Sequence, residues 1–274
     1  MISDAALALD HGLAVVSADS DFARFPELTW LDPLVRCPRW EGHLRPRAMA
    51  GKSPTMASGT YRVKVGSQDL EIPLVPIARD LTIALLISVD LGVAFAEVAG
   101  SELAGKLAPC DVEIVVSVAT MGIPIAIEVT RALGMDDYVI LHKTPKIHLG
   151  DAISEPVHSI TTRAPQTLLF DRARLGAVRG RRVAVVDDVI STGGSTRAAL
   201  NLMRRVGAKP VVVGALVTEG SQWRTHLGAD ADLVRSLGAI PLFRHGPQGE
   251  LVEDWEGLGG SSTAEALHTR GPRS

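Results

Sequence analysis

The sequence RVAVVDDVISTGGST, residues 182–196, constrains the fold most. Residues 183–186 are apolar and mostly β-branched, which is typical of a strand buried on both faces. Two aspartates follow this strand, and a turn rich in hydroxyl groups and glycine comes after them. Apolar residues then recur at helical spacing over residues 199–206, and Gly207 ends this helix. The segment is therefore predicted to be a buried strand, an acidic pair, a polar turn and a helix.

This order predicts an anion site with a polyol site beside it. The glycines let consecutive backbone N–H groups converge on one point, and the helix N-terminus adds partial positive charge, so a phosphate fits there. Asp187 and Asp188 can accept hydrogen bonds from two vicinal hydroxyls or hold Mg²⁺ through water. A sugar phosphate is the ligand that combines both groups. The residues expected to hold its phosphate are Ser191, Thr192, Gly193, Gly194, Ser195 and Thr196.

Other glycine-rich phosphate motifs fit this turn less well. A Walker A loop has a Lys after its glycines, and this turn has none. The dinucleotide fingerprint G-x-G-x-x-G is also missing from the turn. An ordinary strand, turn and helix with surface acids is the remaining alternative. The combination of two acids, four hydroxyl groups and two glycines favours a ligand site over that alternative.

The motif VVDDVISTGGST resembles the phosphoribosyl-pyrophosphate (PRPP) signature of the type I phosphoribosyltransferases. The resemblance extends over about residues 60 to 245. It implies that Asp187 and Asp188 contact the ribose hydroxyls and the Mg²⁺ that accompanies PRPP, and that the turn holds the 5′-phosphate. It also implies that Asp187 assists catalysis near the base or ribose. The family further implies a homodimer.

The alternation of strands and helices predicts the fold class. It is an α/β fold with a doubly wound parallel sheet, and the resemblance implies a sheet of the type I phosphoribosyltransferase type with a small hood. A hairpin around Gly66 is expected to begin the domain, and a helix is expected over residues 91–107. The remaining strands are expected at residues 112–118, 138–141, 183–186, 210–217 and 237–243.

A second turn of small residues follows the strand predicted at 112–118. In a doubly wound sheet, ligands bind beyond the carboxyl ends of the strands, where both turns fall. The backbone N–H groups of the second turn can bind another anion. The resemblance implies that this anion is the pyrophosphate of PRPP; a tight turn without a ligand is the alternative. The residues of this pyrophosphate loop are Ala119, Thr120, Met121 and Gly122.

The polar segment 142–171 is long for a connection, which indicates a lid. Lys143 and Lys146 can neutralise pyrophosphate as the glycosidic bond breaks, although a solvated charge pair is the alternative. The segment resembles the lid of xanthine phosphoribosyltransferases and is related to that of the adenine enzymes. His142 stands where an Arg is usual, and Thr162 stands where the adenine enzymes have Glu.

The segment after the strand at 210–217 is expected to bind a purine base. Glu219 can accept a hydrogen bond from a ring N–H, and Trp223 either stacks on the ring or packs in the core. The xanthine enzymes generally carry a Lys at about Gly220, which this chain lacks. Two functions remain: transfer of ribose 5-phosphate from PRPP to an adenine- or xanthine-like base, or PRPP sensing as in the purine-operon repressors.

The flanking segments differ from the central domain. Residues 1–34 resemble a truncated PIN-domain fragment with acids at Asp4, Asp19 and Asp21. Residues 35–58 have the composition of a linker, the phosphoribosyltransferase domain is expected over 59–245, and 246–274 are expected to form a disordered tail.

Composition and charge narrow the classes of function. A net charge of −3 gives no electrostatic reason for bulk nucleic-acid binding. The apolar run at residues 81–99 contains Asp90 and Glu97, so it is expected in a core instead of a membrane. With Cys37 and Cys110 as its only cysteines, the protein is expected in the reducing cytoplasm.

Overall fold

The computed structural model describes residues 14–16, 29–31, 59–145, 149–157 and 166–256. The chain divides into two units, Met1–Ser53 and Pro54–Ser274. In the first unit, β1 (Ala14–Val16) pairs in parallel with β2 (Thr29–Leu31). Asp4, Asp19 and Asp21 lie outside the described residues. The resemblance to a PIN-domain fragment therefore stays a prediction.

The second unit is built on a parallel sheet. Its strands lie in the order β12, β11, β10, β6 and β7, and every neighbouring pair is parallel. This arrangement confirms the predicted doubly wound sheet. The strands are β6 (Ile114–Val118), β7 (Tyr138–Leu141), β10 (Arg182–Ile190), β11 (Lys209–Glu219) and β12 (Val234–Ile240).

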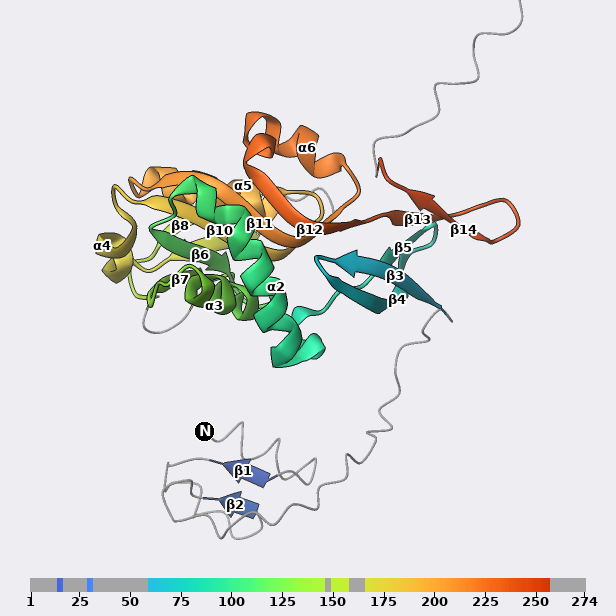
Figure 1. The fold of residues 1–274 in the computed structure, drawn as a ribbon, viewed down its shortest axis with the longest axis horizontal. Coiled ribbons are helices and arrows are strands. Elements are labelled where there is room, and N and C mark those ends of the chain that lie inside the picture. The colour runs from blue at the N-terminus through green and yellow to red at the C-terminus, as the bar shows by residue number, and fades with distance from the viewer. Residues whose placement is uncertain (1–13, 17–28, 32–58, 146–148, 158–165, 257–274) are drawn as a thin grey trace, which may run out of the picture. The chain divides into compact units, whose positions relative to one another are not determined.

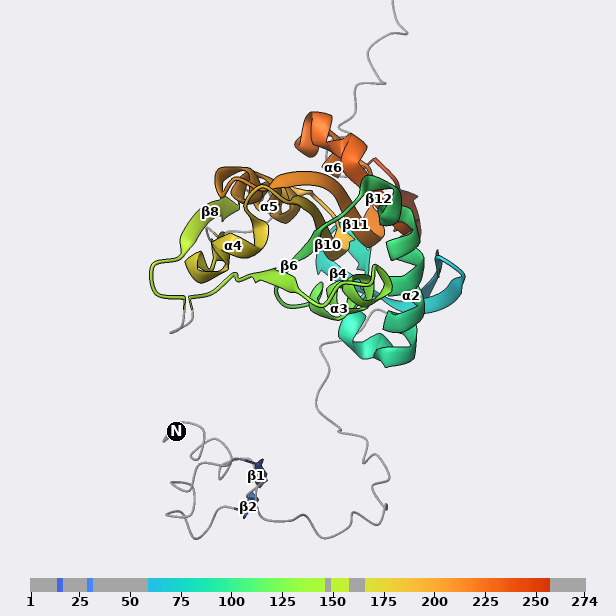
Figure 2. The ribbon, with the colours of Figure 1, turned by 60° about the vertical axis from the view of Figure 1, so that its left-hand side comes forward.

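Helices cover both faces of this sheet (Figures 1 and 2). Alternate residues of β10 face opposite cores: Ala184 packs with α2 and α3, whereas Val185 packs with α5. This alternation is why the run is apolar at every position. The helices are α2 (Gly92–Leu107), α3 (Ile123–Ala132), α4 (Leu175–Val178), α5 (Gly194–Arg205) and α6 (Gln222–Leu227). Short 3₁₀ helices cover Ser88–Leu91 (η2), Ala108–Cys110 (η3), Arg172–Arg174 (η5) and Gly228–Leu233 (η6).

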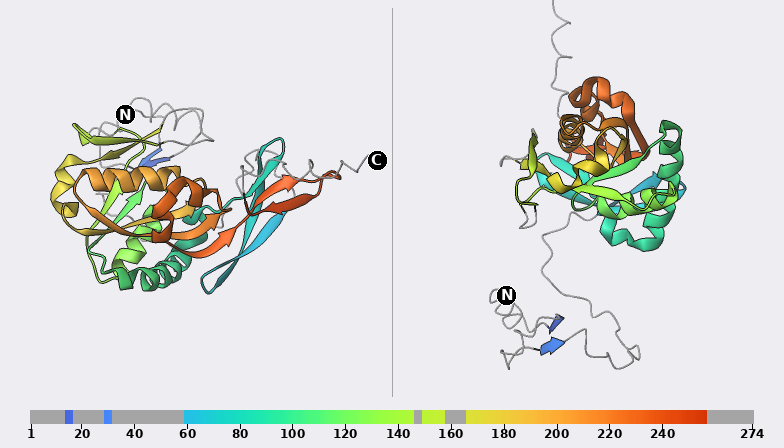
Figure 3. Two further views of the ribbon diagram at one scale, coloured as in Figure 1. Left: turned by 90° about the horizontal axis from the view of Figure 1, so that it is seen from above. Right: turned by 90° about the vertical axis from the view of Figure 1, so that its left-hand side faces the viewer.

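An antiparallel sheet forms the hood beside the main sheet (Figure 3). The predicted hairpin around Gly66 is present, and Gly66 has a φ of 60° that favours glycine. The backbone N–H of Ser67 donates to Glu102 of α2 at 3.0 Å, which ties the hood to the main sheet's helices. The hood strands, in sheet order, are β14 (Leu251–Asp254), β13 (Leu242–His245), β5 (Leu81–Ala84), β4 (Gln68–Ala78) and β3 (Thr60–Val65).

The C-terminal part differs from the prediction in two ways. The strand expected at 237–243 is two strands, because β12 ends before Pro241 and β13 continues in the hood. Proline has no N–H for a ladder, which explains the break. The disordered tail was expected to start at residue 246, but β14 pairs with β13 and Gly246 N–H donates to Glu250 at 2.8 Å. Residues 257–274 lie outside the described part of the chain.

The segment predicted to be a lid contains a small hairpin. β8 (Ile153–Val157) pairs with β9 (Gln166–Phe170) in antiparallel fashion. Leu168 and Phe170 are fully buried against α5, so this part of the segment is anchored to the core. Across the described residues, no helix has the length and apolar character that a membrane span requires.

Candidate active site

The structure brings most of the predicted site residues around one pocket of about 200 Å³. The pocket lies at the carboxyl edge of the parallel sheet, where β6 and β10 end, as predicted for this class of sheet. Lys146 lies outside the described residues. The predicted residues that line the pocket are Asp187, Asp188, Ser191, Thr192, Gly193, Gly194, Ser195, Thr196, Lys143, Ala119, Thr120 and Met121.

Asp187 and Asp188 belong to the strand itself. β10 continues through both residues to Ile190, and Asp187 pairs with Ala215 of β11. The backbone N–H of Asp188 donates to the Asp187 carboxylate at 3.0 Å. Burial, followed by the charge of Asp188, raises the pKa of Asp187 well above its usual value, and burial raises the pKa of Asp188. Two crowded carboxyls of this kind favour a cation or hydroxyl donors as their ligand.

These raised pKa values predict a pH-dependent stability. Each carboxyl has a higher pKa in the folded protein than its unfolded value of about 4, because the folded state favours the neutral carboxyl. The stability that the neutral carboxyls contribute at low pH is therefore lost as pH rises through the raised values. The double variant Asp187→Asn with Asp188→Asn has no titrating group at either position, so it does not lose stability in this way. In the absence of PRPP and divalent cations, the melting temperature of the double variant should therefore exceed that of the wild type increasingly from pH 4 upwards.

The measurement is thermal unfolding across a pH series. Asp69→Asn, which changes an exposed aspartate on β4 of the hood, is the matched control and should follow the wild type. A constant difference between the double variant and the wild type at all pH values would contradict the assignment.

The turn predicted to hold a phosphate, residues 191–196, leads directly into α5. Gly193 has a φ of 80°, and a Cβ there would lie 3.4 Å from the backbone of Trp223, so glycine suits this position. α5 begins at Gly194, and the backbone N–H groups of its first turn have no acceptor within the helix. These groups and the residues Ser195 and Thr196 lie at the same pocket, which is where the sequence predicted an anion site.

The pyrophosphate loop is fixed by neighbouring elements. Its Ala119–Thr120 peptide bond is cis, and Ser88 of η2 donates a hydrogen bond to the carbonyl of Met121 at 2.5 Å. Ser117, at the end of β6, is fully buried, and its hydroxyl has no hydrogen-bond partner among the described residues. Sequence reasoning missed Ser117, although a serine within an otherwise apolar strand is a signal that could have identified it.

Gly122 allows the loop to lie against the acidic strand. A Cβ at this position would lie 2.4 Å from Ser117 Oγ, 2.8 Å from Asp187 Oδ1 and 3.2 Å from the Asp187 Cα. Because the Asp187 backbone cannot move freely, Gly122→Ala should displace the loop or the carboxylate. We expect a loss of about 1–3 kcal/mol in unfolding free energy and weaker PRPP binding.

Denaturant unfolding and calorimetry with PRPP test this prediction. Gly105→Ala in α2 is the control, since a Cβ there meets nothing within 4 Å, and alanine favours the helix. Wild-type stability and wild-type PRPP affinity in Gly122→Ala would show that the close approach has no consequence.

A second pocket of about 320 Å³ opens beside the first, under the hood. Asp188, Val189, Ser191 and Thr192 line both pockets. The hood contributes an apolar wall that sequence reasoning missed, because it treated residues 81–99 only as core. The remaining lining residues are Ile77, Leu81, Ile83, Ala84, Leu85, Leu86, Glu219, Gln222 and Leu242.

The two residues predicted to bind the base have different positions. Glu219 lines the hood pocket, is 8% exposed, and accepts a hydrogen bond from Ser191. Its burial raises the pKa of this carboxyl. Trp223 is only 2% exposed in the core around α5, and its indole N–H donates to the Gly220 carbonyl at 3.1 Å. Of the two roles considered for Trp223, this position favours packing.

Lys143 is the cationic side chain among the described residues that line the first pocket. It lies just after His142, whose backbone exchanges hydrogen bonds with Leu169 of β9 at 2.9 and 2.8 Å. This bridge fixes the start of the predicted lid. The backbone directly before Lys143 is therefore anchored where this side chain lines the pocket.

The fold and the pocket define an α/β protein with a polar pocket at a topological switch point of its parallel sheet. Residues 101–235 match the model of the phosphoribosyl transferase domain. This segment is therefore similar to the phosphoribosyl transferase domain, in agreement with the predicted fold class.

Three relatives illustrate the range of proteins to which the chain is similar. The chain is 26% identical over 156 residues to a xanthine phosphoribosyltransferase of Laribacter hongkongensis. This alignment covers 56% of the chain and 77% of the relative. It is 33% identical over 116 residues to a hypoxanthine/guanine phosphoribosyltransferase of Methanococcus maripaludis (42% and 58%). It is also 33% identical over 107 residues to the transcriptional regulator GfcR 1 of Methanosarcina barkeri (39% and 46%). The chain thus spans about half the length of the last two relatives.

Proposed function

We propose that this protein transfers ribose 5-phosphate from PRPP to a purine base, as in purine salvage, giving a nucleoside monophosphate and pyrophosphate. The observation that carries this proposal is the joining of two pockets at Asp188 and Ser191. One pocket has the acidic pair, the anion loops and Lys143, and the other has apolar walls of a kind that suits a purine ring.

In the proposed complex, each part of PRPP binds a separate group of residues. The ribose hydroxyls donate to Asp187 and Asp188, and the 5′-phosphate accepts from the loop 191–196. The pyrophosphate lies on the loop 119–122 and on Lys143. When the base nitrogen bonds to C1, the C1–O bond breaks and its electron pair leaves with pyrophosphate. Lys143 and the backbone N–H groups stabilise the charge that develops there.

The acidic pair fits Mg²⁺ as an ion that arrives with PRPP. The described residues contain no group of three His, Cys, Asp or Glu side chains that could hold a metal by themselves. Mg²⁺ characteristically keeps several waters and uses one or two carboxylates together with substrate phosphates. Asp187 and Asp188 would hold it, and it would supply charge neutralisation for the pyrophosphate.

The base is proposed to be a purine that presents an N–H donor to Glu219. The relatives in the comparison are named for xanthine and for hypoxanthine and guanine, and the hood pocket of this chain has Glu219 and Gln222 as polar groups within apolar walls. The position of Gly220, where a Lys was expected for the xanthine enzymes, offers no cation to an oxygen of the base. Adenine therefore stays a candidate beside the 6-oxopurines.

We also propose a cytoplasmic homodimer. Exposed apolar side chains lie close to the first pocket, with Val89 46% and Val93 87% exposed on the segment that Ser88 ties to Met121. A second copy of the chain can cover such a surface. Sedimentation equilibrium should give twice the chain mass, and a monomer at micromolar concentration would rule this assembly out.

A PRPP-sensing regulator is the second candidate function. The specific observation in its favour is the 33% identity to a transcriptional regulator. Such a protein would bind PRPP in the same pocket without releasing pyrophosphate. The two candidates therefore differ in turnover and agree in binding.

The test is pyrophosphate release from PRPP and Mg²⁺ with adenine, guanine, hypoxanthine or xanthine. The proposed enzyme releases pyrophosphate with at least one of these bases and needs that base to do so. PRPP binding by calorimetry without release in any of the four reactions would favour the regulator.

A further inference from the structure

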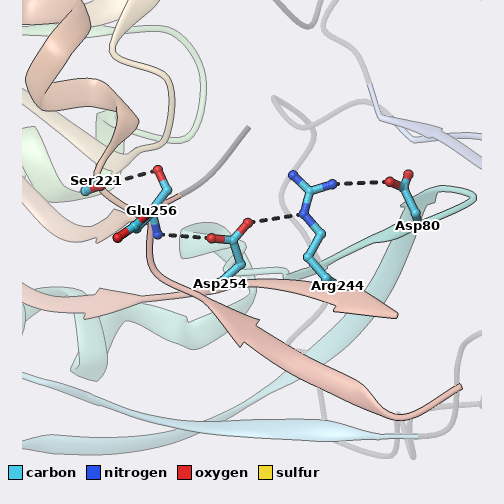
Figure 4. Close-up of polar contacts among 5 residues, drawn as sticks. All are labelled: Asp80, Ser221, Arg244, Asp254 and Glu256. Carbon is cyan, nitrogen blue, oxygen red and sulfur yellow. Dashed lines mark hydrogen bonds and ion pairs between the residues drawn. The ribbon is translucent and has the colours of Figure 1, made fainter. Parts of the chain in front are cut away.

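A series of polar contacts joins the C-terminal strand to both sides of the hood pocket (Figure 4). Arg244 of β13 contacts Asp254 of β14 at 3.1 Å and Asp80 of the β4–β5 turn at 3.4 Å. The backbone N–H of Glu256 donates to Asp254 at 3.1 Å, and Ser221 Oγ donates to the Glu256 carbonyl at 3.3 Å. These five residues are called the C-terminal network below.

Arg244 lies on the face of the hood sheet that lines the pocket. In β13, Leu242 pairs with Ile83 and Arg244 pairs with Leu81, so these side chains share one face. Leu81, Ile83 and Leu242 all line the hood pocket. Asp254 pairs directly with Leu242 and continues the same face onto β14. The ion pair therefore forms the polar edge of the surface whose apolar part forms the pocket wall.

The opposite end of the network reaches the other wall. Ser221 stands between two pocket-lining residues, Glu219 and Gln222. Its hydroxyl is bonded to the backbone just beyond β14. The C-terminal strand thus connects the apolar wall of β5 and β13 to the polar wall that carries Glu219. Neither end of the network lines the first pocket, where PRPP is proposed to bind.

The ion pair is sufficiently buried to fix this geometry. The side chain of Arg244 is 29% exposed and that of Asp254 is 20% exposed, whereas Asp80 is 75% exposed. Partial burial strengthens an ion pair relative to one in open solvent. The guanidinium group can also contact two carboxylates at once because its N–H donors are arranged in a planar fork.

We propose that Arg244, acting through the C-terminal network, is a positioning residue for the purine base. It sets the distance between the β5 wall and the wall with Glu219, and so determines how well the base is held for attack on C1. This inference rests on the proposed phosphoribosyltransferase function and adds a specificity element to it. PRPP binding, in contrast, is independent of Arg244.

The expected consequence is a selective change in the kinetics of the base. Arg244→Ala should raise the KM for the best of the four purine bases about tenfold, which corresponds to about 1.4 kcal/mol of lost binding free energy, since a displaced wall holds the base less tightly. The kcat at saturating base should stay within about twofold, because the lost interaction acts on binding. The shift in melting temperature on addition of PRPP and Mg²⁺ should equal that of the wild type.

Three further variants separate positioning from general stability. Arg244→Lys keeps one ion pair, so its KM for the base should lie between that of the wild type and that of Arg244→Ala. Ser221→Ala removes one exposed hydrogen bond, leaves the fold intact, and should raise the KM in the same direction by a smaller factor. Arg62→Ala is the matched control, because Arg62 pairs with Glu71 at 2.7 Å on the outer hood hairpin and lines neither pocket.

The outcomes are distinguishable from a failure of the proposed function. A wild-type protein that releases no pyrophosphate with any of the four bases overturns both proposals. If the wild type is active, an unchanged KM for the base in Arg244→Lys and Ser221→Ala overturns the positioning role alone, even where Arg244→Ala does not fold. Equal losses of base and PRPP binding in Arg244→Ala also overturn it, since they indicate general destabilisation.

Discussion

Replacement of both pocket aspartates, Asp187→Asn with Asp188→Asn, should abolish PRPP binding while the fold stays intact. Each carboxylate is expected to accept a hydrogen bond from a ribose hydroxyl or to hold Mg²⁺. Hydrogen bonds to charged groups contribute about 1.5–3 kcal/mol each. The loss of two such groups therefore corresponds to a dissociation constant for PRPP that is at least about 100-fold larger. Calorimetric titration of PRPP in the presence of Mg²⁺ measures this change.

The asparagine pair also provides an internal control for folding. Burial and mutual repulsion raise the pKa of Asp187, so neutral side chains of the same shape should leave the apo protein at least as stable as the wild type at neutral pH. An unfolded or strongly destabilised variant would mean that the acids have a structural role. A folded variant with wild-type PRPP affinity would remove them from the site.

Lys143→Ala should lower kcat about 100-fold, by analogy with the loss of one oxyanion-stabilising group. Lys143 lines the pocket with the pyrophosphate loop, and its charge is expected to meet the leaving group as the C1–O bond breaks. An interaction that strengthens in the transition state affects kcat more than ground-state binding. The dissociation constant for PRPP should therefore change by a smaller factor than kcat.

Single-turnover kinetics and calorimetry together test the role of Lys143. Lys209→Ala is the matched control, since Lys209 is an exposed lysine at the amino end of β11, at the opposite edge of the sheet. It should behave as the wild type. A variant of Lys143 with unchanged kcat would return this residue to the solvated surface lysine that the sequence also allowed.

The parallel sheet and the positions of the two loops predicted to bind anions could be read from the sequence because their signals are local. β6 is apolar except for Ser117, β10 contains the apolar run 183–186, and each strand is followed by small or hydroxyl-bearing residues before a helix. A strand buried on both faces has no polar alternation, so its position is clear from the sequence. Because the loops sit at strand ends, the fold class alone places them at one edge.

The hood pocket could not be predicted, because it depends on pairing between distant segments. β5 and β13 are neighbours in the sheet, although about 160 residues of sequence separate Leu81 from Arg244. β14 lies in a stretch with the composition of a disordered tail, and only its pairing with β13 makes it a strand. The burial of Trp223 could not be predicted for the same reason, since its packing partners around α5 decide whether the ring is buried or open to a ligand.

The most direct test of the proposed reaction is the stoichiometry of its products. The full chain is incubated with PRPP, Mg²⁺ and the preferred purine, and the nucleotide and pyrophosphate are quantified in the same reaction. The proposed transfer gives one nucleoside monophosphate for each pyrophosphate, and the Asp187→Asn, Asp188→Asn protein gives neither. Pyrophosphate without the nucleotide, or bound PRPP with neither product, would contradict the account.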